Sequence, residues 1–315
     1  MNICVLDAYT LNPGDLNWDI LNKYGKLSIY NQTLPTEIVE RTIDADILIV
    51  NKVVLSAEII AQLSKLKYVI VSATGYNNID IDAFRKRNIP VSNIVNYGTE
   101  AVAQHTFALI LALCNKVEEH NIAVKEGQWE KTTNFCFWNA PLIELKNKKL
   151  GIIGMGSIGN KVAEIGKAFG MDIIYYSKSG KKSVFGTETS LEFLLQNADV
   201  ITLHTHLSTD NEGFVNLDFL RKLKKSAFLI NTSRGKLVNE ADLHFALVNN
   251  IISGAALDTL AEEPVRLKNP LIGVKNCIIT PHIAWAPVET RNRMMEMIEY
   301  NIHSFLEGTI QSRIV

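Results

Sequence analysis

The chain has 315 residues, of which 47 % are hydrophobic and 21 % charged, and its formal net charge is −1. This length predicts two domains, and the near-neutral charge argues against nucleic acid or an anionic membrane surface as a partner. The longest apolar run, residues 107–114, is too short to span a bilayer. Four scattered cysteines without a C-x-x-C pair favour reduced thiols over disulfides or a zinc site, so a cytoplasmic protein is predicted.

The first part of the chain alternates short apolar runs with amphipathic stretches. Helices are predicted over residues 16–24 and 57–63, the second with Ser56 as its N-cap. Alternation of strands and helices at this spacing predicts a parallel sheet with helices on both faces. The five predicted strands are Ile3–Leu6, Leu27–Tyr30, Ile47–Val50, Tyr68–Val71 and Pro90–Asn93.

A long helix is predicted next, over residues 100–125, with Thr99 as its cap and an apolar middle. The aromatic segment that follows, residues 129–138, is too apolar for an ordinary exposed connection. Either it packs on its own domain, or it is buried against a second subunit, because an exposed apolar patch usually marks an interface. The second alternative predicts a homodimer.

The strongest motif begins at a short apolar run, residues 150–153, which predicts a buried strand. Gly154, Gly156 and Gly159 follow at the G-x-G-x-x-G spacing, and residues 157–169 have helical periodicity. The glycines allow a tight turn and close approach of a phosphate, while backbone N–H groups and the helix dipole attract the anion. This arrangement predicts a dinucleotide site.

The same alternation continues after the motif and predicts a six-stranded doubly wound sheet. A capping box of Thr189 and Glu192 opens one helix, and an amphipathic helix follows Pro287. The predicted fold class is α/β, with two Rossmann-like doubly wound parallel-sheet domains. The other five strands of the second sheet are Asp172–Tyr176, Val200–Leu203, Ala227–Asn231, Ser253–Leu257 and Cys277–Ile279.

Three polar clusters follow strands of this second sheet, at the carboxyl edge where open α/β sheets build their sites. Arg234, between a buried strand and a glycine, is placed to bind a carboxylate with two hydrogen bonds. An acid of the segment 258–263 can orient a catalytic base, and His282 follows the last strand. Taken singly, none of these signals is specific, because a surface arginine, a solvated acid and a structural histidine are the more common explanations.

Taken together, the clusters resemble the D-isomer-specific 2-hydroxyacid dehydrogenase family over essentially the whole chain. Residues 231–235, 256–264 and 280–283 match the family patterns N-x-x-R-G, A-x-D-x-x-x-x-E-P and T-P-H-I, in the family's order. Residues 73–80 resemble the family's substrate loop, and residues 102–104 resemble its hinge-helix signature.

Within this family, three short segments are most similar to the glycerate dehydrogenase (hydroxypyruvate reductase) branch. They are Asn51-Lys52, Cys136-Phe137-Trp138 and residues 281–285.

The resemblance implies a mechanism. Arg234 would bind the carboxylate and keto oxygen of a 2-oxo acid, and His282 would protonate the alkoxide. Glu263 would hydrogen-bond the far imidazole nitrogen and favour the imidazolium. Backbone N–H groups of Thr74 and Gly75 would hold the substrate carboxylate.

Three further residues are candidate substrate contacts. Lys52 would add a cation beside the substrate, with a solvated lysine as the alternative. Trp138, from a partner subunit, and Trp285 would line the pocket, with core or interface packing as the alternative.

The resemblance also implies a division of the chain. Residues 1–97 and 286–315 would form a flavodoxin-like substrate domain, residues 98–285 an NAD(P)-binding domain, and the active site would lie in the cleft between them. Asp258 would accept a hydrogen bond from the nicotinamide carboxamide, and no metal is predicted. The predicted cofactor-binding residues are Gly154, Gly156, Ser157, Ile158, Gly159, Ser177, Lys178, His204, Thr232, Asp258 and His282.

The sequence departs from the family where the second nucleotide-binding strand ends. An Asp or Glu is expected about 20 residues beyond the glycines, as the acceptor for the adenosine ribose. Here Ser177 stands at that position and Lys178, Lys181 and Lys182 follow, while His206 replaces a proline common in relatives. Losing the acid removes repulsion of a 2′-phosphate, so NADP or dual use is predicted; a loose charged loop is the alternative.

The main prediction is an oxidoreductase that transfers a hydride between NAD(P)(H) and a small D-2-hydroxy acid/2-oxo acid pair. D-Glycerate/hydroxypyruvate or glycolate/glyoxylate is the favoured pair. Another D-2-hydroxy acid, such as D-lactate, is the enzymatic alternative. A non-enzymatic NAD(H)-sensing corepressor of the same fold is the second alternative, and it predicts cofactor binding without turnover.

Overall fold

The computed structural model describes residues 1–265 and 268–315, which form two compact units. One unit comprises Met1–Gly98 and Trp285–Val315, and the other comprises Thr99–Ala284.

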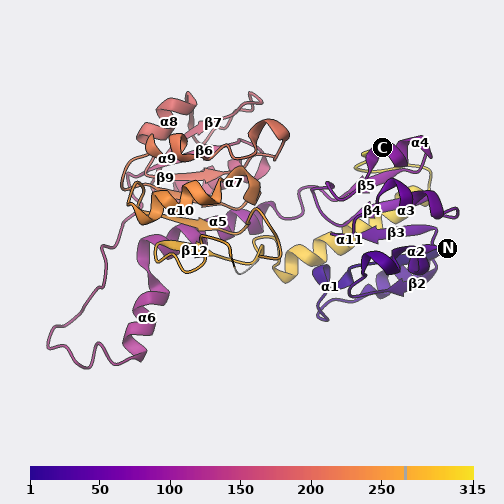
Figure 1. Cartoon of the computed structure of the whole chain (residues 1–315), viewed down its shortest axis with the longest axis horizontal. Helices are drawn as coiled ribbons and strands as arrows, with labels where there is room; N and C mark the ends of the chain where they lie inside the picture. Colours follow the sequence, from indigo (N-terminus) through magenta and orange to yellow (C-terminus); the bar gives the residue numbers. More distant parts are fainter. Residues whose placement is uncertain (266–267) are drawn as a thin grey trace. The chain divides into compact units, whose positions relative to one another are not determined.

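The first unit is built on a five-stranded parallel sheet in the order β2-β1-β3-β4-β5 (Figure 1). The central strands β3 and β4 are fully buried and, apart from the hydroxyl of Tyr68, apolar, as expected for strands covered on both faces. This strand order is that of flavodoxin-like doubly wound folds. The strands are β1 (Asn2–Val5), β2 (Lys26–Ile29), β3 (Ile47–Val50), β4 (Tyr68–Val71) and β5 (Val91–Asn93).

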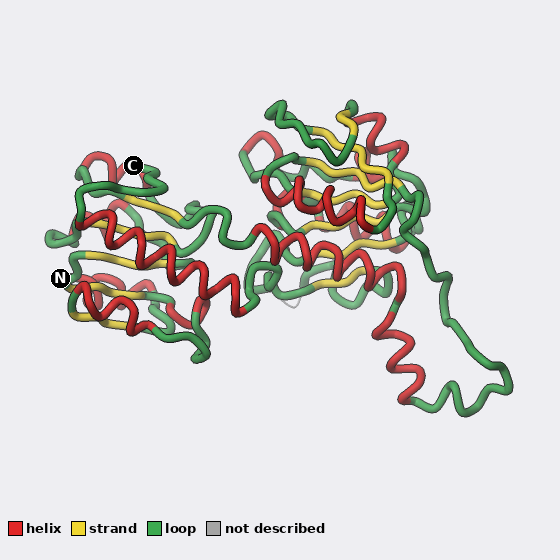
Figure 2. Tube along the Cα trace, turned by 180° about the vertical axis from the view of Figure 1, so that it is seen from behind, coloured by secondary structure: helices red, strands yellow, loops and turns green. Residues whose placement is uncertain are grey.

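Helices cover both faces of this sheet. Alternate strand residues point to two separate hydrophobic cores. One of these cores includes the long helix α11 (Val288–Leu306), which lies over one face of the sheet (Figure 2). The other elements of this unit are α1 (Ala8–Leu11), η1 (Trp18–Tyr24), η2 (Pro35–Glu37), α2 (Ile38–Thr42), α3 (Ala57–Gln62) and α4 (Ile81–Lys86).

Two local predictions in the first unit need correction. The helix expected over residues 16–24 is the 3₁₀ helix η1, which Asn17 caps by accepting the N–H of Asp19. Ser56 does precede α3, but its side chain accepts no hydrogen bond from the helix backbone. The chain end adds a feature without a sequence signal: Ile314 donates its N–H to the Val91 carbonyl at 2.8 Å, which covers the edge of β5.

The second unit contains a seven-stranded parallel sheet in the order β12-β11-β10-β9-β6-β7-β8. The sequence predicted six of these strands and missed β8, a two-residue exposed edge strand without an apolar pattern. The doubly wound α/β fold class is confirmed. The strands are β6 (Lys149–Ile153), β7 (Asp172–Tyr176), β8 (Thr187–Glu188), β9 (Val200–Leu203), β10 (Phe228–Asn231), β11 (Gly254–Leu257) and β12 (Cys277–Ile279).

Apart from α6, the main helices of the second unit lie on both faces of its sheet, and each face has its own hydrophobic core. The capping box was misplaced by one residue, because Ser190 and not Thr189 caps α8 by accepting the N–H of Phe193. The helices are α5 (Thr99–Asn115), α6 (Val117–Lys125), α7 (Ser157–Ala168), α8 (Leu191–Asn197), η3 (Thr209–Asn211), α9 (Leu217–Arg221), η4 (Gly235–Leu237) and α10 (Glu240–Val248).

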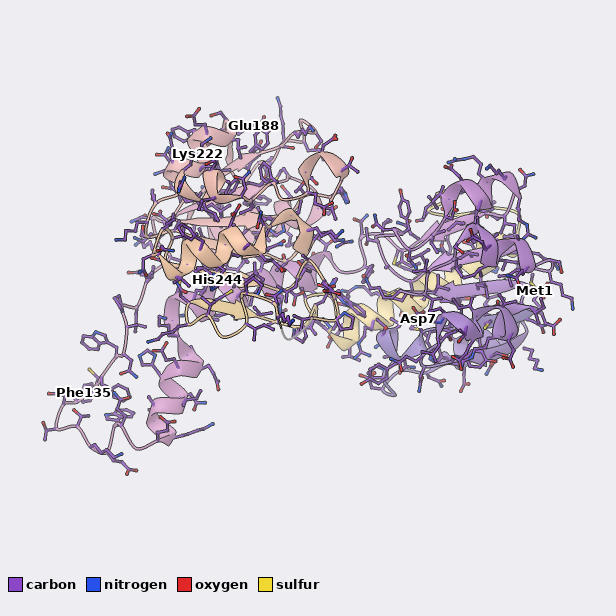
Figure 3. All side chains as sticks on the ribbon, viewed as in Figure 1. Met1, Asp7, Phe135, Glu188, Lys222 and His244 are labelled. Carbon is purple, nitrogen blue, oxygen red and sulfur yellow. The ribbon has the colours of Figure 1, made fainter. Side chains whose placement is uncertain are left out.

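The helix predicted over residues 100–125 is broken at Lys116, whose φ of 48° lies in the left-handed region. Helix α6 starts a new direction after this break. The prediction of Thr99 as the cap is also wrong, because Thr99 is the first residue of α5. Helix α6 and the segment that follows it project from the body of this unit as an arm, with Phe135 near its tip (Figures 1 and 3). We call residues 117–142 the arm. Among the described residues, no helix is long and apolar enough to cross a membrane.

Candidate active site

In the glycine turn after β6, two of the three glycines are in close contact with other backbone atoms, and the third faces open space. A Cβ on Gly154, whose φ is 100°, would lie 2.3 Å from the carbonyl oxygen of His204. A Cβ on Gly159 would lie 2.2 Å from the carbonyl oxygen of Gly154. A Cβ on Gly156, the N-cap residue of helix α7, would meet nothing within 4 Å. The turn therefore leaves room for a pyrophosphate at a helix N-terminus.

The end of β7 presents a hydroxyl where a ribose-binding acid is usual. Ser177 is buried, and its Oγ lies 3.3 Å from Oγ of Ser179. Gly180 closes a turn here by donating its N–H to the Ser177 carbonyl at 3.1 Å. The side chains of Lys178, Lys181 and Lys182 in this segment are exposed.

His204 follows β9 with both ring nitrogens buried, and neither has a hydrogen-bond partner among the residues that the structure describes. Burial lowers the pKa of this imidazole to about 3, so the ring is neutral in the folded protein. His206, two residues further on, is exposed. Thr232, after β10, lies with its Oγ1 3.1 Å from that of Thr106 on α5.

The buried ring of His204 predicts a specific loss of stability in acid. Its folded-state pKa lies below the unfolded value of about 6.5, so the unfolded state binds the proton and stability falls as the pH drops through that value. The free energy of unfolding should fall by about 1.4 kcal/mol between pH 7.5 and 5.5 from this group alone.

Urea unfolding of the cofactor-free protein at both pH values measures this change. The variant His204→Phe should lack this part of the pH dependence, whereas His206→Phe, at the exposed position, should retain it. Equal pH dependence in all three proteins would contradict the prediction.

The loop after β10 presents Arg234 through a local hydrogen-bond network. Asn231 is fully buried and donates its side-chain amide to the Arg234 carbonyl at 2.8 Å, while its Oδ1 accepts the N–H of Ser233. A Cβ on Gly235 would lie 1.9 Å from the backbone of Leu260, so only glycine fits there. The guanidinium of Arg234 is half-buried and donates to the Ser233 carbonyl at 2.8 Å.

Glu263 and His282 form a carboxylate–imidazole pair. Oε2 of Glu263 lies 2.6 Å from Nδ1 of His282, and Oε1 accepts the N–H of Leu260 at 3.0 Å. The side chains are only partly exposed, at 35 % for Glu263 and 27 % for His282. With Nδ1 bound to the carboxylate, Nε2 is the ring nitrogen available to exchange a proton with a ligand.

The backbone of His282 is unusual, since its φ of 55° lies in the left-handed region. Such a conformation costs of order 1–3 kcal/mol in a residue other than glycine and persists only where neighbouring contacts hold it. Asp258, at the end of β11, supplies two such contacts by accepting the N–H groups of Ile283 and Ala284, each at 2.9 Å.

The carboxylate of Asp258 is almost completely buried, and this burial acts to raise its pKa. Hydrogen bonds from the His105 and Thr280 side chains and from the two backbone N–H groups outweigh the burial, so the pKa lies below its usual value. Asp258 is therefore ionised at neutral pH. The sequence did not predict a role for His105, although it directly follows the hinge-helix signature.

In the first unit, the loops with the predicted substrate-binding residues follow strands β3 and β4. The Asp7 carboxylate after β1 accepts the backbone N–H groups of Asn51, Lys52 and Val53, so an acid missed in the sequence fixes the loop that carries Lys52. The side chain of Thr74 donates to the Ile94 carbonyl at 3.1 Å.

The remaining predicted residues of the substrate site lie in different environments. Gly75 is half-buried in the same loop as Thr74. Trp285 packs against the core that contains α11, whereas Trp138 is 64 % exposed on the arm. Within residues 1–265 and 268–315, no cluster of His, Cys, Asp and Glu side chains is arranged to hold a metal ion.

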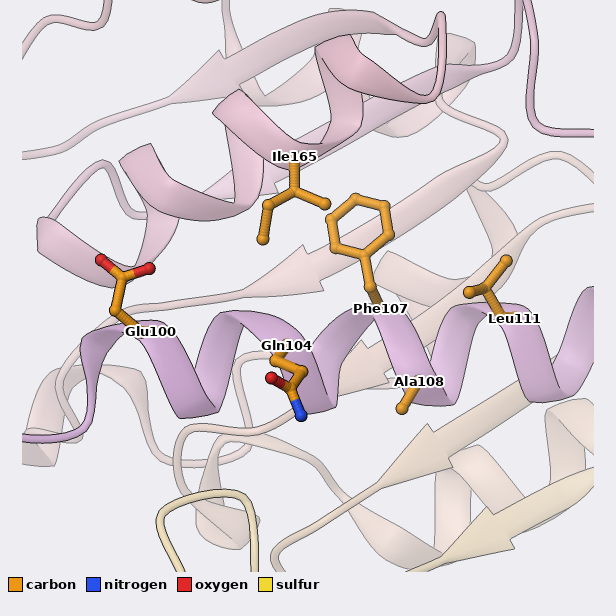
Figure 4. A pocket seen from close by; sticks show the side chains of 6 residues that line it. All are labelled: Glu100, Gln104, Phe107, Ala108, Leu111 and Ile165. Atoms are coloured by element: carbon orange, nitrogen blue, oxygen red, sulfur yellow. The ribbon is translucent and has the colours of Figure 1, made fainter. Parts of the chain in front are cut away.

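A shallow groove of about 430 Å³ lies between α5 and α7 (Figure 4). Its lining is mostly apolar, with one carboxylate and one amide at one end. The lining residues are Glu100, Gln104, Phe107, Ala108, Leu111 and Ile165.

Comparison with known proteins identifies the family. Residues 107–284 match the NAD-binding domain of D-isomer-specific 2-hydroxyacid dehydrogenases. The chain belongs to this family. The match contains the glycine turn, Arg234, Glu263 and His282, and it confirms the family, the enzyme class and a nicotinamide cofactor as predicted from the sequence.

Individual members of the dehydrogenase family resemble the chain along most of its length. A hydroxypyruvate reductase of Blautia hydrogenotrophica is 42 % identical over 98 % of both chains. A glycerate dehydrogenase of Methylorubrum extorquens is 36 % identical over 88 % of both chains. Among solved structures, an acyclic imino acid reductase in complex with NADPH and D-arginine is 32 % identical over 100 % of both chains, with a TM-score of 0.89.

Proposed function

We propose that the protein reduces a small 2-oxo acid to its D-2-hydroxy acid, with hydroxypyruvate, which yields D-glycerate, as the preferred substrate and glyoxylate as the second. The Glu263–His282 pair, 2.6 Å apart, is the observation that carries the proposal, because it is an acid–base device with one ring nitrogen left for a ligand. The names of the two relatives, hydroxypyruvate reductase and glycerate dehydrogenase, support the choice of substrate.

The proposed roles follow from the chemistry of the side chains. Arg234 binds the substrate carboxylate and keto oxygen and polarises the carbonyl. His282 donates a proton from Nε2 to the oxygen of the reduced carbon, while Glu263 holds the ring by its contact with Nδ1. The bound cofactor supplies the hydride.

We assign the first unit to the substrate and the second to the cofactor. Backbone N–H groups of Thr74 and Gly75 bind the substrate carboxylate in this proposal, and Lys52 adds positive charge. Trp285 contributes an apolar wall. The cofactor residues proposed in the second unit are Gly154, Gly156, Ser157, Ile158, Gly159, Ser177, Lys178, His204, Thr232, Asp258 and His282.

The substrate assignment is tested with a panel of 2-oxo acids, each assayed with NADH and with NADPH. The loss of absorbance of the reduced cofactor measures turnover. Hydroxypyruvate should give the highest kcat/KM, with glyoxylate next. Highest kcat/KM with pyruvate would favour a D-lactate dehydrogenase. Quenching of tryptophan fluorescence by cofactor without turnover of any acid would favour the corepressor alternative.

The proposal includes use of NADPH, alone or beside NADH. Ser177 carries no charge to repel a 2′-phosphate, and three exposed lysines lie within five residues of it. The NADPH in the related imino acid reductase shows that this fold accommodates the phosphorylated cofactor. A preference for NADH above tenfold in kcat/KM would contradict the proposal.

A charge at residue 177 should change this preference. The variant Ser177→Asp should lower kcat/KM with NADPH by roughly tenfold or more relative to NADH, because a like-charge contact at this buried position costs more than about 1 kcal/mol. The uncharged variant Ser177→Ala is the matched control and should keep the ratio of the two kcat/KM values near that of the original protein. An unchanged ratio in Ser177→Asp would place the 2′-phosphate elsewhere.

We also propose a homodimer in the cytoplasm, with Trp138 reaching the substrate site of the partner subunit. The four cysteines are unpaired, which fits a reducing compartment. The arm supports the dimer because it exposes large apolar side chains that its own unit does not cover. They are Val117, Ile122, Val124, Trp129, Phe135, Trp138 and Leu142.

The arm makes the dimer testable. Phe135 is 92 % exposed, so the variant Phe135→Asp should not change the folding of a monomer. In a dimer whose interface contains residue 135, the new carboxylate would be buried without a partner, which disfavours association. Sedimentation should show a dimer for the original protein and a shift to monomer for the variant. The control Val184→Asp changes a side chain that is 94 % exposed outside the arm and should remain a dimer.

A further inference from the structure

Beyond the two residues that follow His282, Asp258 also binds a residue that precedes it. The Thr280 hydroxyl donates to Oδ1 of Asp258 at 2.6 Å, and the N–H of His282 donates to the Thr280 carbonyl at 3.0 Å. Together with the N–H groups of Ile283 and Ala284, this places three donors from both sides of His282 on one carboxylate. The left-handed backbone of His282 is held from both directions.

His105 on α5 extends this network. Its Nε2 lies 3.0 Å from Oγ1 of Thr280 and 3.4 Å from Oδ1 of Asp258. The Thr280 hydroxyl has a single proton, which the ionised Asp258 accepts, so Oγ1 must accept from His105 and Nε2 must carry a proton. The imidazole is only 19 % exposed, and its donated hydrogen bond polarises the threonine hydroxyl and strengthens the contact to the carboxylate.

We infer that His105 is a positioning residue for His282, acting through Thr280 and Asp258. The inference rests on the proton-donor role proposed for His282. Without the N–H of His105, the Thr280 hydroxyl loses its donor, its hydrogen bond to Asp258 weakens, and the segment 280–284 is less firmly held. The ring of His282 then meets Glu263 and the substrate less precisely, and a misplacement of about 1 Å can cost 10²-fold in rate.

Two matched pairs of variants test this role. His105→Gln keeps an N–H donor close to the position of Nε2, whereas the shorter amide of His105→Asn does not reach Thr280. Thr280→Ser keeps the hydroxyl, and Thr280→Val replaces it with a methyl group of the same shape. Steady-state kinetics with hydroxypyruvate as the probe substrate, a pH profile of kcat and fluorescence titration with the reduced cofactor are measured for each.

We expect His105→Asn and Thr280→Val to lower kcat by roughly 10- to 100-fold and to shift the limb of the pH profile that His282→Asn abolishes. His105→Gln and Thr280→Ser should stay within about threefold of the original kcat, and all four should bind the cofactor within about twofold. The double variant, His105→Asn with Thr280→Val, should be no slower than the slower of the two single variants, because the two residues act through one hydrogen-bond chain.

The role is overturned if His105→Asn and Thr280→Val keep kcat within about twofold of the original value. It is also overturned if all four variants lose kcat and cofactor affinity together, because that result indicates a general structural effect. Thermal unfolding of each variant comes first; if Thr280→Val does not fold, the His105 pair decides, since it leaves residue 280 unchanged. The variant His282→Asn distinguishes the proton-donor role of His282 from the positioning role of His105. Full activity in that variant would refute the proposed proton donor, whereas an inactive His282→Asn beside neutral His105 variants would refute the positioning role alone.

Discussion

Replacing His282 by asparagine should lower kcat for hydroxypyruvate reduction by roughly 10²- to 10⁴-fold, which is the usual contribution of a positioned general acid. Asparagine is the appropriate replacement because it tolerates the left-handed φ of 55° that His282 adopts, whereas alanine would add backbone strain. The variant therefore removes the proton donor and leaves the loop in place. KM should change much less than kcat, since the proton is transferred only in the transition state.

Two comparisons make this result specific to the site. The variant His244→Asn, on helix α10, changes the same residue type outside the Glu263–His282 pair and should leave kcat unchanged. The variant Glu263→Gln removes the charge that faces Nδ1 of His282 and should lose less activity than His282→Asn, because the ring remains. If His282→Asn kept kcat within a factor of a few, another group would have to donate the proton.

The second large effect is expected at Arg234. Replacing it by lysine should lower kcat/KM by about 10²- to 10³-fold, or about 2.7–4 kcal/mol, the usual effect of removing one donor to a developing oxyanion. Lysine keeps the charge but cannot present two parallel N–H groups to a carboxylate. The carbonyl of Ser233, which now accepts from the guanidinium, would also lose its donor.

Steady-state kinetics measure this change, and the exposed Arg221 on α9 provides the matched control. Arg221→Lys makes the same substitution at the end of a helix and should leave kcat/KM unchanged. Since Arg234 is proposed to bind substrate as well as to polarise it, KM should rise and kcat should fall. A rise of KM alone would assign Arg234 to carboxylate binding without a role in the chemical step.

Local patterns predicted most of the two sheets. The strand β3 is an unbroken apolar run of four residues, and its bounds agree with the sequence prediction because burial on both faces leaves a continuous signal. Strand β8 has no such signal, since both of its residues are exposed at the sheet edge. The break at Lys116 also leaves no signal in the sequence, because neither glycine nor proline marks it.

The candidate site also contains residues that the sequence predicted and residues that it did not. The motif spacing pointed to Arg234, Glu263 and His282, and the structure places Glu263 within hydrogen-bond distance of His282. The spacing did not reveal His105, which lies 175 residues from Thr280 along the chain. It also did not reveal Asp7, whose carboxylate binds a loop 44 to 46 residues away.

The sequence by itself determined the features that depend on near neighbours in the chain. The glycine turn at Gly154 is one of them, because its φ of 100° is a backbone conformation that glycine adopts without strain. Tertiary structure decided which distant side chains share a hydrogen bond, as His105, Thr280 and Asp258 do. Strand order and helix packing bring such groups together, and neither leaves a periodic trace in the residues themselves.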